Sequence, residues 1–191
     1  MGLSKPATEL VRFELAEIEA DGWRSYPELG RLAQVAPLDM SQQSFLARCK
    51  SLHELWQHVP NGFLRNLLKC AGCPNGKIKE LGSLKLFQAL LNIIEALNEQ
   101  EETQDSFSSS KEPEVWNDRN DVMAPLFLTN DLRIADAHEA MGASLTTLQE
   151  LGFDIASVNE GYGRALDFVM DAVIDSLGKV ATEIEKLVKR G

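Results

Sequence analysis

Four polar side chains in the second half of the chain are of the types that cleave a phosphodiester. Asn130, Asp131, Arg133 and His138 fall within nine residues of one another. A guanidinium can stabilise the charge that develops on phosphoryl oxygens, and an imidazole can transfer a proton near neutral pH. The chain has only three histidines, so the choice of acid–base groups is narrow. This stretch therefore predicts a catalytic site composed of these four residues.

The spacing of the two central residues restricts how they can meet. On a straight helix, five residues place Arg133 and His138 about 140° apart around the axis and about 7.5 Å apart along it. A working site therefore needs His138 at a helix end, or a second copy of the motif from a partner chain. The alternative is structural: Arg133 pairs with Asp136 at the surface, and His138 interacts with the negative end of the helix.

Arg133, four intervening residues and His138 resemble the Arg-x(4–6)-His motif of the HEPN superfamily, over about residues 80–191. The resemblance implies a compact helical bundle, usually a homodimer, in which two motifs meet at the interface. Many members are metal-independent endoribonucleases of toxin–antitoxin and antiphage systems. By this resemblance the RNA 2′-hydroxyl attacks the adjacent phosphate, His138 assists proton transfer and Arg133 holds the phosphate. It implies no cofactor, and it implies RNA and a neutralising antitoxin as partners.

A second pair, Arg48 and His53, has the same spacing. The pair at 133 and 138 is preferred because Asn130 and Asp131 surround it with polar groups and because a long terminal helix follows it. The preference depends on this context, since the two pairs have the same chemistry.

A second constellation could bind zinc. Cys49, His53, Cys70 and Cys73 have the spacing C-x3-H, sixteen residues, C-x2-C, and all four are suitable ligands for a tetrahedral zinc site. Cys49 and His53 would share one helix face, and the turn at 70–73 could form a metal knuckle. Cysteines on helices are also commonly buried as small apolar residues, so both interpretations stay open.

The elements that position these residues are expected to be helices, because apolar residues recur at three and four along nearly the whole chain. The expected helices cover about residues 7–20, 41–57, 62–69, 83–100 and 121–141, with a short apolar piece within 144–160 and a long last helix that carries apolar residues from 166 to 187. The predicted fold is therefore an all-α helical bundle with a long C-terminal helix.

The last helix has the clearest pattern. Its apolar residues are spaced 3, 4, 4, 3, 4, 3, namely Leu166, Val169, Val173, Leu177, Val180, Ile184 and Leu187. This spacing is typical of a helix packed in an all-helical domain, and it is also typical of a helix that pairs with its copy across a dimer.

Two regions are expected. The turn-rich stretch at 71–76 predicts a boundary between an N-terminal helical region, 1–75, and a HEPN-like helical domain, 76–191. Residues 103–114 are polar and rich in serine, which predicts a mobile surface loop.

Composition limits the class of protein. The chain has 191 residues, 44% hydrophobic and 25% charged, which excludes disordered, collagenous and disulfide-scaffold proteins. No apolar run approaches the roughly 18 residues that span a bilayer, and the acidic, amphipathic start differs from a signal peptide. We therefore expect a cytoplasmic protein with reduced thiols and no membrane partner.

Charge favours an alternative function. Residues 101–191 hold 8 basic and 18 acidic residues, so they account for the whole net charge of −10. Such a surface would repel a polyanion at long range, which counts against extended nucleic-acid binding but not against a small local site. The alternative to an endoribonuclease is a non-catalytic helical module for dimerisation or partner binding, so enzymatic activity stays open at this point.

Overall fold

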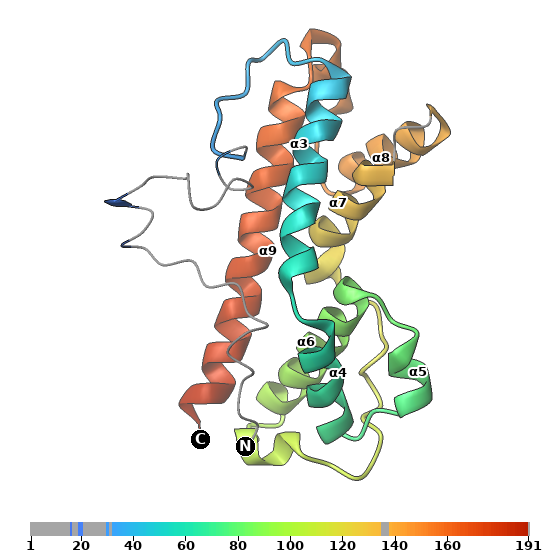
Figure 1. Cartoon of the computed structure of the whole chain (residues 1–191), viewed down its shortest axis with the longest axis vertical. Coiled ribbons are helices and arrows are strands. Elements are labelled where there is room, and N and C mark those ends of the chain that lie inside the picture. The colour runs from blue at the N-terminus through green and yellow to red at the C-terminus, as the bar shows by residue number, and fades with distance from the viewer. Residues whose placement is uncertain (1–15, 17–18, 21–29, 31, 135–137, 191) are drawn as a thin grey trace. The chain divides into compact units, whose positions relative to one another are not determined.

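The computed structural model describes residues 16, 19–20, 30, 32–134 and 138–190 (Figure 1). These residues form helices joined by turns, with no strand among them. The helices are α3 (Gln42–Glu54), α4 (Asn61–Cys70), α5 (Asn75–Lys79), α6 (Ser83–Glu99), α7 (Ala124–Ile134), α8 (His138–Glu150) and α9 (Gly163–Lys189). Short 3₁₀ helices cover Leu55–His58, Gln104–Phe107, Asp121–Met123 and Ile155–Glu160. The described residues confirm the all-α class and the long C-terminal helix.

The spacing of apolar residues predicted the positions of the helices more accurately than it predicted the residues at which they begin and end. The predicted helices 62–69 and 83–100 match α4 and α6 to within one residue at each end. The predicted helix 41–57 is shorter, because α3 ends at Glu54 and a 3₁₀ turn follows it. The apolar piece expected within 144–160 belongs to α8, which begins earlier, at His138. The predicted helix 7–20 lies largely outside the described residues.

The described chain divides into two compact units. The first combines residues 59–123 with 175–190, and the second combines residues 32–58 with 124–134 and 138–174. Each unit contains residues of both predicted regions, 1–75 and 76–191. Long-range packing therefore sets the limits of these units, and the turn at 71–76 lies inside the first of them.

The first unit has an apolar core between α4 and α6. Leu64 and Leu68 from α4 pack against the buried face of α6, and Trp116 from the following loop joins them. The α6 residues of this core are Leu86, Ala89, Leu90, Ile93 and Ile94. Burial of each large aliphatic side chain stabilises the unit by about 1.5–3 kcal/mol. The strongly apolar sequence of α6 accounts for its central place in the unit.

The expectation of a mobile surface loop at 103–114 is wrong for its first half. Phe107 is only 3% exposed and belongs to the core of the first unit. The backbone N–H of Ser109 donates to the carbonyl of Cys70 at 2.9 Å, which fixes the loop against the end of α4. The serine-rich composition concealed one aromatic side chain whose burial orders the segment.

In the second unit α3 packs against α7, and α7 packs against α8. Phe45 and Leu52 of α3 are buried, as are Leu126, Leu128 and Leu132 of α7. Leu128 and Leu132 are four residues apart and therefore share one face of α7, while Asp131 and Arg133 are exposed near the C-terminal end of the helix. The candidate site lies on that helix.

Most of the apolar stripe of α9 packs inside the chain. Five of its seven residues are buried, namely Leu166, Val169, Val173, Val180 and Leu187. Leu177 is half-buried and Ile184 is 37% exposed. The structure therefore favours the packed-helix interpretation for most of the stripe. None of the helices in the described part of the chain is both long and apolar enough to cross a membrane.

Candidate functional site

The predicted site residues Asn130, Asp131 and Arg133 lie on the last two turns of α7. Arg133 and Asp131 are exposed and Asn130 is half-buried, whereas Leu128 and Leu132 are buried in the core of the unit. The guanidinium of Arg133 donates from Nη2 to Oδ1 of Asn130 at 3.1 Å. This hydrogen bond restrains the side chain of an exposed arginine, and a guanidinium is a good ligand for an anion. The structure therefore brings the predicted cation and amide together at the surface.

His138 is the first residue of α8, whereas α7 is described up to Ile134. Arg133 and His138 therefore belong to separately described helices, and the angle calculated for a straight helix does not fix their separation. Residues 135–137, including Asp136, and the side chain of His138 lie outside the described residues. The meeting of Arg133 and His138 stays a prediction.

A different histidine lies against the site. His53 of α3 is buried, and its Nδ1 is 3.3 Å from Oγ1 of Thr129 on α7. The Thr129 hydroxyl itself donates to the carbonyl of Leu126 at 2.7 Å. Since that hydroxyl has a single hydrogen, its oxygen accepts from His53, and the imidazole carries its proton on Nδ1.

Burial and charge keep this imidazole neutral. Desolvation by burial is the largest effect that lowers the pKa of His53 below 6.5, and the positive charge of Arg133 lowers the pKa further. The negative charge of Glu54 opposes them in part. The structure thus places an uncharged imidazole close enough to Arg133 for the arginine charge to lower its pKa.

Sequence analysis missed this arrangement. It named His53 as a zinc ligand and as a partner of Arg48, and it did not consider Thr129. Arg48 instead donates from Nη2 to the backbone carbonyls of Leu32 and Gln34, at 2.6 and 2.7 Å. The one-turn spacing of Thr129 and Arg133 could have indicated from the sequence that these two residues are neighbours. Only the packing of α3 on α7 shows that Thr129 contacts His53.

The four candidate zinc ligands are divided between the two units. Cys49 and His53 belong to α3 in the second unit, and Cys70 and Cys73 lie at and just after the end of α4 in the first. Burial raises the pKa of the Cys49 thiol to about 12 and that of Cys73 to about 11, so both thiols are protonated in the metal-free chain. No group of three or more His, Cys, Asp or Glu side chains within the described ranges could hold a metal ion. The zinc prediction therefore gains no support.

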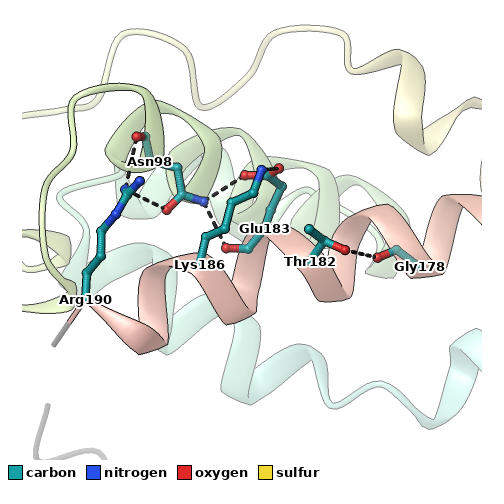
Figure 2. Close-up of polar contacts among 6 residues, drawn as sticks. All are labelled: Asn98, Gly178, Thr182, Glu183, Lys186 and Arg190. Atoms are coloured by element: carbon teal, nitrogen blue, oxygen red, sulfur yellow. Dashed lines mark hydrogen bonds and ion pairs between the residues drawn. The ribbon is translucent and has the colours of Figure 1, made fainter.

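A second polar cluster joins α6 and α9 in the first unit (Figure 2). Asn98 donates from Nδ2 to the backbone carbonyl of Glu183 at 2.9 Å and to its carboxylate at 2.8 Å. Arg190 donates in turn to the carbonyl of Asn98 at 3.0 Å, and Lys186 pairs with Glu183. These groups bind one another and attach the end of α9 to α6, so the cluster is structural.

A third set of polar residues, along α6, is also occupied within the first unit. Gln88 donates to the carbonyl of Asp118 at 2.9 Å, and Asn92 donates to the same carbonyl at 2.9 Å and to that of Val115 at 3.1 Å. Asn120 donates to Asn92 at 2.9 Å and to the carboxylate of Glu95 at 2.7 Å. These amides fix the loop that follows residue 114 onto α6.

Comparison with protein-family models, with curated proteins and with solved structures finds no match to this chain.

Proposed function

We propose that the chain is a metal-independent endoribonuclease of the toxin–antitoxin or antiphage defence type, acting in the cytoplasm as a homodimer. The observation that carries the proposal is the exposed guanidinium of Arg133, held by Asn130 at the end of α7. An exposed arginine that a neutral amide orients is suited to bind a phosphate. The placement of Arg133 on α7 and of His138 at the first residue of α8 supports the proposal, because the two residues of the motif then belong to separately described helices.

The reaction needs three groups. Arg133 binds the non-bridging phosphoryl oxygens and stabilises their growing charge, while Asn130 fixes the direction of the guanidinium. The RNA 2′-hydroxyl attacks the neighbouring phosphorus, and the bond to the 5′-oxygen breaks. His138 assists the transfer of a proton during this step. Asp131 is exposed two residues before Arg133, and residues two apart on a helix do not face each other, so no step is assigned to it.

The proposed partners follow from charge and from the motif. The excess of acidic residues in 101–191 favours an RNA contact confined to a few nucleotides near Arg133 over a long binding track. A second copy of the chain would bring a second Arg133 and His138 to the site. An antitoxin or other protein partner that covers Arg133 would block it.

Cleavage of a mixed single-stranded RNA pool, with and without EDTA, tests the proposal. We expect cleavage that EDTA does not reduce, that is lost in Arg133→Ala and in His138→Ala, and that persists in Arg48→Ala. Arg48 is the matched control, because it shares the Arg-x4-His spacing but binds backbone carbonyls. Cleavage that EDTA abolishes, or full activity of the His138 variant, would contradict the proposed chemistry.

The second candidate function, a non-catalytic helical module for dimerisation or partner binding, is favoured by exposed apolar side chains near the end of α9. Ile184 is 37% exposed and Val188 is 58% exposed, one turn apart on the same helix. Such a surface is typical of a helix that contacts another protein.

Multi-angle light scattering of the Ile184→Glu/Val188→Glu double variant tests this interface. We expect the double variant to have a lower oligomeric mass at micromolar concentration than the unmodified chain. The matched control is Val35→Glu, which changes an apolar residue that is 92% exposed elsewhere. Equal masses for the unmodified chain and both variants would contradict the proposed interface at Ile184 and Val188. A monomeric unmodified chain would contradict the proposed homodimer.

A further inference from the structure

The contact between α3 and α7 defines which nitrogen of the His53 imidazole carries the proton. The hydroxyl of Thr129 donates to Leu126, so its oxygen accepts from Nδ1 of His53. A neutral imidazole has one N–H group and one lone pair. With the proton on Nδ1, the lone pair is on Nε2. His53 is buried except for 8% of its surface, and a hydroxyl can reach Nε2 only through that exposed part.

The position of this imidazole relative to Arg133 follows from helix geometry. Thr129 and Arg133 are four residues apart on α7, so they are neighbours on one face of that helix. His53 touches the first of them, and the charge of the second acts on its ring. Both helices belong to the second unit, so one chain supplies the pair.

We propose that His53 is a second catalytic residue of this site and accepts the proton of the RNA 2′-hydroxyl through Nε2. The inference rests on the proposed endoribonuclease function. In the step, the 2′-oxygen forms a bond to phosphorus and its proton passes to His53. The bond from phosphorus to the 5′-oxygen breaks, and His138 gives a proton to that oxygen. The products are a 2′,3′-cyclic phosphate and a 5′-hydroxyl, and no further reactant is needed.

The surroundings of the ring suit this role. A general base must be unprotonated when substrate binds. The burial of His53 and the charge of Arg133 on α7 favour the neutral form, whereas Glu54 on α3 opposes it. The hydrogen bond to Thr129 favours the tautomer that leaves the basic lone pair on Nε2. His53 and His138 would therefore divide the roles of base and acid.

Two RNA oligonucleotides of the same sequence test this division. One has ordinary linkages, and the other has sulfur in place of the bridging 5′-oxygen at the cleaved position, a leaving group that needs no proton. On the ordinary RNA we expect His53→Gln and His138→Ala each to cleave about 10²–10⁴-fold more slowly than the unmodified chain. On the sulfur-containing RNA, His138→Ala should recover most of its rate, whereas His53→Gln should not.

The pH dependence gives a readout that a purely structural role would not change. The rate of the unmodified chain should fall at low pH as His53 takes up a proton, and this acidic limb should be absent in His53→Gln. A His53→Gln variant with the unmodified rate and the unmodified acidic limb would overturn the inference while leaving the endoribonuclease intact. If the unmodified chain cleaves neither RNA, the result would contradict the proposed endoribonuclease function and therefore also this inference.

Nuclear magnetic resonance of the histidine side chains tests the inference on the unmodified chain, so the result does not depend on whether a variant folds. In the unmodified chain the ¹⁵N shifts of His53 should report the Nδ1–H tautomer, and in Arg133→Ala the pKa of His53 should rise because a nearby positive charge is removed. Thr129→Val preserves the shape of the residue but removes the acceptor. Its His53 should populate both tautomers, and its cleavage rate should fall several-fold. An Nε2–H tautomer in the unmodified chain would overturn the inference.

Discussion

Helices α6 and α7 both carry side-chain amides, but they use them differently. On α6, Asn92 is 6% exposed and donates to backbone carbonyls of the loop that it fixes. On α7, Asn130 is half-buried and accepts from Arg133, which is exposed. The amide on α6 attaches a loop inside the fold, whereas the amide on α7 orients an exposed cation. The comparison teaches that a candidate site is recognised where a polar side chain orients an exposed charged group instead of joining two parts of the fold.

The strongest test of this difference is Arg133→Ala. We expect the substitution to reduce RNA cleavage by about 10²–10³-fold, which is typical of the loss of one group that stabilises transition-state charge. The free energy of unfolding should change by no more than about 0.5 kcal/mol, because the side chain is exposed. Urea denaturation and single-turnover cleavage on the same preparation measure both quantities. A large loss of stability would mean that Arg133, like Asn92, serves the fold.

The reverse behaviour is expected for Asn92→Ala on α6. The variant removes a donor to the carbonyls of Val115 and Asp118 and the acceptor of Asn120, inside the fold. Buried polar groups left without a partner cost about 1–3 kcal/mol, so the free energy of unfolding should fall by that amount. Cleavage measured well below the unfolding transition should be unchanged. A stability unchanged within error would show that water satisfies these groups.

The smallest expected effect concerns Glu95, the carboxylate at the edge of the α6 network. Burial raises its pKa above 4.5, Glu183 and Glu99 raise it further, and the hydrogen bond from Asn120 opposes them. The folded chain then holds this proton more tightly than the unfolded chain, so the contribution of Glu95 to stability is greatest below pH 4.5 and is lost as pH rises through the folded-state pKa.

Glu95→Gln should therefore stabilise the chain slightly at pH 7, by less than about 1 kcal/mol, since solvent screens a carboxylate that is only partly buried. The dependence of stability on pH between 4 and 7 should become weaker by about the same amount. Urea denaturation across that range measures both effects. A variant that is less stable at pH 7 would show that the ionised carboxylate supports the network.

Local pattern was sufficient for much of the fold. The spacing of apolar residues located α4, α6 and α9, because a helix that buries one face must repeat its apolar residues at three and four. It did not place Phe107, since one buried aromatic residue inside a serine-rich stretch leaves no periodic signal. It also did not reveal the two units, which join segments far apart in the chain.

The candidate site was only partly predictable for the same reason. Asn130 and Arg133 are three residues apart, so their hydrogen bond follows from helix geometry. His53 and Thr129 are 76 residues apart, and their contact depends on how α3 lies on α7. The types of residue at the site were visible in the sequence, but the partner of each residue was not.

The way α9 serves both units has a consequence for synthesis on the ribosome. Its first twelve residues belong to the second unit, and the first unit includes residues 175–190, among them the core residue Leu187. The second unit therefore has all its segments only after residue 174 has been translated, and the first unit has its full core only after residue 187. A chain that stops just before residue 175 would contain every segment of the second unit. It would lack the C-terminal part of α9, which completes the core of the first unit.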